Sequence, residues 1–412
     1  MPSTPASPTF TTGFVIVDDD GNVGYEPPPA LRDQLEKAVL DGDLDTTKHL
    51  LDKIHDRSGW CGEIDTREHF DVLSHALQTG MRAGLAATSA ACLRAMGGDR
   101  ALREMAQREM PQVLRTVPAS QRAGDLIRLP AAALDCWARL VTEAGLTGIL
   151  TPGAAASMLG GVRRSTPLLR AAMKEADQFL AVIEGYAHAG REKLVRGESL
   201  LSLMQGRANG GETVLLAAAL QNGGTQLHTF LKAAHAARRG NALSEKEYVQ
   251  LISEGRPGST VLAALCEPTR LVDADEPPAL DVQRGEALAT YLQGLLLARL
   301  PSAVSLSDKT FAEILLSPGS DGRPAIRQCS QRQAREIRSR LQRALETGML
   351  PAPTVQKILA QVPEVQAQSP AEVRPQGHAF GDRVREAVQR GDIEKVWELH
   401  RRTPGPVKQD LA

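Results

Sequence analysis

Cys61 has the surroundings that most favour catalysis in this sequence. It lies between Trp60 and Gly62 in the segment RSGWCGEIDTREHFD, and His69 and Asp71 follow within ten residues. Cysteine, histidine and aspartate are the residue types of a cysteine protease, in which a base activates the thiol. However, such residues meet through the fold rather than through proximity in sequence, and the chain before Cys61 is short for a catalytic domain. The sequence therefore favours a non-enzymatic protein, with a Cys61-dependent, protease-like enzyme as the alternative.

Metal and phosphate chemistry are not indicated. His49 and His55 are six positions apart, as are His69 and His75, which places each pair on different helix faces, and no HExxH motif occurs. The five cysteines form no CxxC pair. The glycine-rich segments GRANGGET and SPGSDGRP lack the Gly-Lys-Ser/Thr ending of a phosphate-binding loop, so they predict turns between helices. We expect neither a metal nor a cofactor.

The charge distribution excludes a general attraction to polyanions. Lys and Arg number 48 and Asp and Glu number 49, which gives a net charge of −1. The basic segment 327–345 has no interleaved aromatic residues and is interpreted as a solvated helix face or a protein interface rather than a nucleic-acid site. The sequence has no run of 18 apolar residues, so we expect a soluble protein without membrane insertion.

The N-terminal segment predicts a disordered leader followed by a β-hairpin. Residues 1–13 contain no charge and are rich in Ser, Thr and Pro, a composition that cannot bury enough apolar surface to fold. It is typical of an ordinary tail, and it also resembles the leaders exported by type III secretion systems. Residues 14–29 combine a β-branched run, an Asp/Gly/Asn turn and three prolines, and predict a hairpin with a Pro-rich linker. We expect this to be the only strand pair.

The remaining chain predicts an all-α protein. Aromatic residues make up only 3% of the chain, against 42% apolar residues overall, which favours closely packed helix pairs over a sandwich or barrel. The openings STPLL, ETVLL and STVL place Thr166, Thr213 and Thr260 at a constant interval of 47 residues. A small polar residue before an apolar run predicts a helix N-cap. Three caps at one interval predict a repeated helical unit.

A second marker is an apolar pair followed closely by Gly or Pro, which predicts a helix end. The six copies are at Val113, Met158, Leu203, Leu251, Ile314 and Ile358. Their spacings of 45, 45, 48, 63 and 44 residues indicate one unit with a single insertion, which we place in a surface loop around residues 272–282. One such unit cannot cover its own apolar face, whereas stacked neighbours can, so the pattern predicts an α-solenoid of roughly 47-residue repeats.

The two ends of this array share one pattern. LRDQLEKAVLDGDLDTTKHLLDKI starts at residue 31 and FGDRVREAVQRGDIEKVWELHRR starts at residue 380. Both read A-V-x-x-G-D, which predicts two helices joined by a tight turn, with Gly42 or Gly391 at positive φ and Asp43 or Asp392 capping the second helix. The predicted organisation is therefore a leader (1–13), a hairpin and linker (14–29), an N-terminal cap (30–64), a repeat array (65–362), a linker (363–379) and a C-terminal cap with its tail (380–412).

These patterns carry a resemblance to a known family. The openings of the form T-x-L-L-x-A-A, the segment ALQNGG and the A-V-x-x-G-D ends resemble ankyrin-like repeats, in the lengthened form found in type III effectors of Gram-negative pathogens. The sequence departs from ankyrin repeats in its period, in lacking T-P-L-H-x-A, and in having no hairpins between the helices. The resemblance implies a protein-binding scaffold that a type III system secretes into a host cell, where it engages a host protein.

The resemblance also implies partners and exposed contact residues. A secretion chaperone is a further candidate partner besides the host protein, and a scaffold working inside the bacterium is an alternative to the effector. Protein-binding residues in such arrays occupy positions that the repeat does not constrain. We expect exposed contact residues at Gln221, Asn222, His228 and Tyr248.

Overall fold

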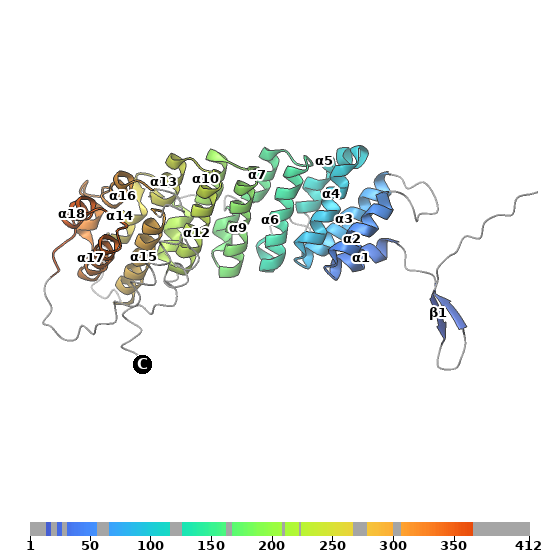
Figure 1. The fold of residues 1–412 in the computed structure, drawn as a ribbon, viewed down its shortest axis with the longest axis horizontal. Coiled ribbons are helices and arrows are strands. Elements are labelled where there is room, and N and C mark those ends of the chain that lie inside the picture. Colours follow the sequence, from blue (N-terminus) through green and yellow to red (C-terminus); the bar gives the residue numbers. More distant parts are fainter. Residues whose placement is uncertain are drawn as a thin grey trace, which may run out of the picture. The chain divides into compact units, whose positions relative to one another are not determined.

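The computed structural model describes most of the chain between residues 14 and 365. The described ranges are 14–17, 23–26, 31–55, 66–115, 126–161, 167–207, 211–221, 224–266, 278–299 and 306–365. Within them the chain forms eighteen α-helices and two small antiparallel strand pairs, which confirms the expected all-α class (Figure 1). The helices group into two compact bodies, divided between residues 120 and 150, and this division lies inside the predicted array.

The predicted N-terminal hairpin is present. Strands β1 (Phe14–Val17) and β2 (Val23–Glu26) pair antiparallel, with Phe14 opposite Glu26 and Val17 opposite Val23. The predicted turn at 18–22 and the leader 1–13 lie outside the described residues, as do residues 366–379 of the C-terminal linker and the C-terminal cap.

The expectation of a single strand pair was wrong. Strands β3 (Glu254–Arg256) and β4 (Ser259–Thr260) form a second hairpin between two helices. Its turn is Pro257-Gly258, and Gly258 has φ +76°. Proline followed by glycine at positive φ suits a type II turn, so the sequence held this signal. The connection that contains Pro318 and Pro324 also reverses direction, because these two residues form an antiparallel β-bridge. The expectation that hairpins between helices are lacking is therefore corrected as well.

The first body contains five helices. They are α1 (Leu31–Leu40), α2 (Leu44–His55), α3 (Thr66–Arg82), α4 (Ala86–Gly98) and α5 (Arg100–Arg115). Helix α3 packs against α1, α4 and α5. The predicted turn between α1 and α2 is confirmed, because Gly42 has φ +69° and the Asp43 carboxylate accepts a bond from the Thr46 amide at 3.0 Å.

Among the described residues of the second body, three helices occur in the same order five times: a short helix, a long helix and a second short helix. We call each set a triplet. The first is η1 (Leu126–Arg128), α6 (Ala131–Leu146) and α7 (Pro152–Gly160); the second is α8 (Leu168–Ala172), α9 (Ala176–Arg191) and α10 (Gly197–Gln205); the third is α11 (Val214–Leu220), α12 (Thr225–Arg239) and α13 (Glu245–Ser253); the fourth is α14 (Val261–Cys266), α15 (Pro278–Leu297) and α16 (Asp308–Leu315); the fifth is η3 (Ala325–Gln328), α17 (Gln331–Glu346) and α18 (Ala352–Leu359).

The predicted helix starts and ends agree with these bounds. The Thr213 hydroxyl accepts from the Leu216 amide at 3.3 Å, and the Thr260 hydroxyl accepts from the Ala263 amide at 3.1 Å, so both N-caps are confirmed, whereas Thr166 lies outside the described residues. The last five predicted helix ends all fall within two residues of the ends of α7, α10, α13, α16 and α18.

The predicted insertion loop is too long at its C-terminal end. It was placed at residues 272–282, but α15 begins at Pro278, so residues 278–282 are helical. Proline is well suited to the first turn of a helix, because its missing N–H group has no partner there in any case. In this segment Pro278 therefore starts a helix rather than extending the loop.

The long helices of the second body pack in chain order. Helix α6 packs against α9, α9 against α12, α12 against α15, and α15 against α17. In Figure 1 these helices lie side by side, with the second short helices α7, α10, α13 and α16 along one edge. Most apolar residues of the long helices are buried, although Leu146 on α6 and Leu180 on α9 are exposed.

Successive triplets are joined by one recurring hydrogen bond. Near the start of four long helices, a glutamine amide donates to a backbone carbonyl near the end of the first helix in the preceding triplet. We call these residues the glutamine rungs: Gln178 to Ile127 and Leu129 at 2.9 and 3.0 Å, Gln226 to Met173 at 2.7 Å, Gln283 to Leu220 at 3.3 Å, and Gln333 to Leu265 at 2.8 Å. The last carbonyl groups of a helix have no hydrogen-bond donor within the helix, and the glutamine rungs supply these donors.

Two buried tyrosines make a similar contact at the other edge of the long helices. The Tyr186 hydroxyl on α9 donates to the Leu159 carbonyl at the end of α7, at 2.7 Å. The Tyr291 hydroxyl on α15 donates to the Ile252 carbonyl at the end of α13, at 2.8 Å. These bonds provide donors for backbone carbonyl groups at the ends of the second short helices.

Candidate functional site

The structure describes only two of the three residues proposed for cysteine chemistry. Cys61 lies outside the described residues, whereas His69 and Asp71 lie on α3. Positions two apart on an α-helix do not face each other, so His69 and Asp71 point in different directions. The Asp71 carboxylate instead accepts from the Arg67 guanidinium at 3.2 Å. Asp71 therefore forms an ion pair with Arg67, one helical turn away.

The described cysteines are poor nucleophiles. Cys92, Cys136, Cys266 and Cys329 are buried free thiols. Burial raises the pKa of the Cys92 thiol to about 12 and that of Cys329 to about 11, so both are protonated at neutral pH. Because the thiolate is the reactive form, these side chains act as small apolar core residues.

Two further findings concern metals and membranes. Among the described residues, His, Cys, Asp and Glu side chains nowhere gather in groups of three that could hold a metal ion. Within the same ranges, every helix is too short or too polar to cross a bilayer.

The basic segment 327–345 forms η3 and α17, and its arginines make intramolecular contacts. The Arg338 guanidinium donates to the Val362 and Pro363 carbonyls at 2.8 and 3.2 Å. Arg340 pairs with Glu336 at 2.6 Å and donates to Gln293 of the preceding long helix at 2.8 Å. These side chains therefore hold the fifth triplet together and join it to the fourth.

The four predicted contact residues differ in accessibility. Gln221 is exposed at the end of α11, and His228 is half-buried on α12. Asn222 lies outside the described residues. Tyr248 was expected on the surface, but its side chain is 0% exposed. The reason is helical periodicity, because Tyr248 shares the buried face of α13 with Leu251 and Ile252, three and four positions on.

Tyr248 belongs to a buried polar network that joins two triplets. Its hydroxyl lies 2.7 Å from Nδ1 of His235 on α12, and Nε2 of His235 lies 3.1 Å from the Gly294 carbonyl on α15. A carbonyl oxygen only accepts, so Nε2 carries the proton and donates to Gly294. Nδ1 is then the acceptor and receives the Tyr248 O–H. The two bonds fix a single neutral tautomer of His235.

The environment of this network disfavours charge. Burial lowers the pKa of His235 to about 4, with Arg239 and His228 lowering it further against the raising effect of the Gly294 bond. Burial also raises the pKa of Tyr248 well above its usual value. Both side chains are therefore neutral at neutral pH and hold the helices together without ionic chemistry.

Gly294 allows the close approach on which this contact depends. A Cβ at this position would overlap the Leu231 side chain on α12. Without a side chain, the backbone of α15 comes near enough to α12 for its carbonyl to reach His235. The glycine and the histidine thus form one interlocking contact between the third and fourth triplets.

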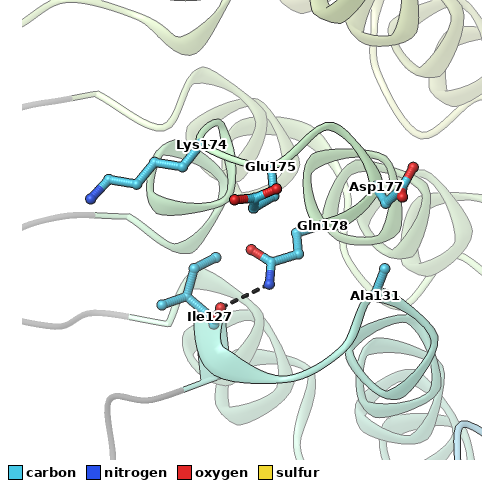
Figure 2. Close-up of a pocket in the computed structure, with 6 residues that line it drawn as sticks. All are labelled: Ile127, Ala131, Lys174, Glu175, Asp177 and Gln178. Carbon is cyan, nitrogen blue, oxygen red and sulfur yellow. Dashed lines mark hydrogen bonds between the residues drawn. The ribbon is translucent and has the colours of Figure 1, made fainter.

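An open pocket of about 450 Å³ lies where the first and second triplets meet. Its lining residues are Ile127, Ala131, Lys174, Glu175, Asp177 and Gln178 (Figure 2). The rung bond from Gln178 to the Ile127 carbonyl forms one wall, and the Gln178 carbonyl oxygen is turned away from Ile127. The Lys174 ammonium group points away from the other lining residues. The pocket thus places the carboxylates of Glu175 and Asp177 and the amide of Gln178 beside the small apolar side chains of Ile127 and Ala131.

Sequence reasoning did not identify the glutamine rungs, His235 or the pocket. The rungs had a usable signal, since a glutamine occurs near the start of four successive long helices. His235 had none, because its partner Gly294 is 59 residues away and contributes only backbone. Comparison of the chain with family models, with curated proteins and with solved structures finds no match.

Proposed function

We propose that the second body is an α-solenoid of helical repeats and that the protein is a non-enzymatic, protein-binding scaffold. The observation that supports this most is the set of glutamine rungs, because one kind of bond recurs at four successive junctions between triplets. Units that repeat the same junction stack with each neighbour in the same way, as in solenoid proteins. The roughly 47-residue spacing of the predicted repeats agrees with the triplet starts.

Binding is the function that such a scaffold serves best. The rungs and buried tyrosines fix the backbone, so exposed side chains at the junctions are held in place without contributing to the core. Gln221 and the pocket residues Glu175 and Asp177 are such side chains, and His228 on α12 is half-buried. The described cysteines are buried and Asp71 is paired with Arg67, so a cysteine-dependent reaction has less support than binding.

The same proposal extends to an ankyrin-like effector that acts on a host protein. It rests on the resemblance of the repeat openings and of the uncharged leader, with a secretion chaperone as an additional partner before export. The confirmed turn at Gly42 and Asp43 supports the ankyrin-like interpretation of the N-terminal cap.

Photo-crosslinking of the full chain tests the binding proposal. A photoreactive amino acid replaces Asp177 at the pocket and, in a matched control, Glu198 on the first turn of α10, which is also exposed. We expect a discrete crosslinked protein from host cytosol at position 177 that is absent at position 198. Equal and diffuse labelling at both positions would contradict a protein-binding surface at this junction.

A translocation assay tests the effector proposal separately. Residues 1–50 are fused to a reporter that is active only in host cytosol, in bacterial strains with and without a working type III apparatus. A signal that requires the apparatus supports delivery into the host. An expressed fusion that gives no signal would refute delivery and leave a scaffold working inside the bacterium.

A further inference from the structure

His235 is a buried titratable side chain whose two ring nitrogens bond to different triplets: Nδ1 to Tyr248 of its own triplet and Nε2 to the Gly294 carbonyl of the next. It lies on α12, is 4% exposed, and bonds to α13 of its own triplet and to α15 of the next. We propose that His235 is an acid-sensitive joint, whose protonation loosens the packing of α12 on α15 and opens the second body locally between its third and fourth triplets. This inference goes beyond the proposed binding function and does not depend on any partner.

Both ring nitrogens are already engaged, and this makes protonation disruptive. An added proton occupies Nδ1, which then donates toward the Tyr248 oxygen at 2.7 Å. The Tyr248 O–H can no longer donate to that nitrogen and has to turn away from the ring, toward the groups that surround it, which include Leu251, Ile252 and Tyr291. Losing this donor–acceptor match in the interior costs free energy, so the network favours the neutral ring.

The surrounding charges add to this effect. Arg239 and His228 on the same helix act on His235 in the direction that opposes a positive ring. Arg238 is also close, since it acts electrostatically on Tyr248, and its buried Nε has no hydrogen-bond partner. A protonated imidazole would therefore join a group of cations.

The charged groups named above as acting on the ring are Arg239 and His228 rather than carboxylates. Helix α11 has no titratable residue, and Tyr291 of α15 is buried and bonded to Ile252. Glu247 of α13 is committed to the capping box with Ser244. Eight other charged or titratable side chains on α9, α13 and α15 have a described burial, and all are exposed or half-buried: Asp177, Glu184, His188, Arg191, Glu245, Lys246, Arg284 and Glu286. Tyr186 of α9 is buried and bonded to Leu159.

The pH window follows from the folded and unfolded states. The pKa of His235 is about 4 in the folded protein, against 6.5 for an unperturbed histidine. A lowered folded pKa means that the open state binds the proton more readily, so stability is complete above pH 6.5 and is lost as pH falls toward 4. With these two pKa values, the equilibrium constant for local opening rises by about 20-fold when the pH falls from 7 to 5.

Hydrogen exchange on the full chain, corrected for intrinsic rates, measures this opening. We expect the amides of α12 and α15 to open about 20-fold more at pH 5 than at pH 7. His235→Gln keeps a donor for the Gly294 carbonyl and an acceptor for Tyr248 but cannot titrate, so its α12 and α15 opening should be independent of pH. The matched control His188→Gln removes a half-buried histidine of α9 whose pKa is also lowered by burial, and it should retain the 20-fold change.

An NMR titration of the wild-type imidazole keeps the test independent of the folding of any variant. The expected result is a His235 midpoint near 4, accompanied by changes in the α12 and α15 amides. A pH dependence that survives His235→Gln would overturn the proposal. So would a His235 midpoint near 6.5 with unchanged α12 and α15 amides.

Discussion

Replacing a buried glutamine rung should destabilise the junction between two triplets far more than replacing an exposed glutamine on the same helix. Gln333 and Gln331 both lie in the first turn of α17. Gln333 is 3% exposed and donates to the Leu265 carbonyl at 2.8 Å, and its own oxygen accepts from the Ser330 amide at 2.9 Å. Gln331 is exposed and makes one long bond to the Glu364 carbonyl at 3.3 Å.

The size of the effect follows from the groups left without partners. Gln333→Ala leaves the buried Leu265 carbonyl without its donor, which costs about 1–3 kcal/mol. It also removes half of the capping box at Ser330, which adds about 0.5–1 kcal/mol. We therefore expect a loss of about 2–3 kcal/mol for Gln333→Ala and less than about 0.5 kcal/mol for Gln331→Ala. Gln226→Ala should cost less than Gln333→Ala, because Gln226 donates to the Met173 carbonyl but its own oxygen is buried without a partner and makes no capping bond.

Native-state hydrogen exchange of the α14 and α17 amides is the appropriate assay, since it measures the opening of this junction rather than of the whole chain. A loss of 2–3 kcal/mol corresponds to an increase of about 30- to 150-fold in the opening constant. Gln333→Met keeps the shape of the side chain without its amide, so it should reproduce most of the effect. Similar losses for Gln331→Ala and Gln333→Ala would refute the role assigned to the rung bond.

Three further substitutions have expected effects on stability, each measurable as a change in the urea midpoint of the second body. Lys193 has φ +62°, which favours glycine, so Lys193→Gly should stabilise the protein by up to about 1 kcal/mol; a loss would show that the lysine side chain contributes more than the backbone strain. Gly294→Ala forces the new methyl group against Leu231 and should cost about 1–3 kcal/mol, and a neutral result would contradict the close approach of α15 to α12. Thr213→Ala removes the N-cap of α11 and should cost about 1 kcal/mol, whereas Thr213→Ser keeps a capping hydroxyl and should lose much less; equal losses would argue against capping as the cause.

Local signals predicted much of the fold because they act over a few residues. The caps at Thr213 and Thr260 and the turn at Gly42 depend on one side chain and its adjacent backbone, and all three are confirmed. The Pro257-Gly258 turn was equally local, but the short strands beside it contain a single β-branched residue, Thr260, which is too weak a signal to identify a strand. Its hairpin was therefore missed.

The candidate site was less predictable, because it depends on contacts between distant segments. Tyr248 was expected to be exposed because it was assigned to a position that the repeat does not constrain, but its burial depends on which face of α13 packs against the neighbouring helices. His235 meets a carbonyl made accessible by a glycine 59 residues on, and neither residue type signals the other. Whether Cys61 has any chemistry stays a prediction, because it lies outside the described residues.

The glutamine rungs bond to main-chain oxygens, and this has a consequence for how such a chain can change. Every residue type presents the same carbonyl group, so the acceptor at Met173, Leu220 or Leu265 places no demand on the side chain at that position beyond its burial. Each junction therefore constrains one glutamine directly, while its neighbours are free to vary in identity as long as they stay apolar. Duplication of a triplet preserves the contact automatically, and subsequent drift erases the likeness between copies without disturbing the stack. A protein joined in this way can keep its architecture long after its sequence has ceased to resemble its origin.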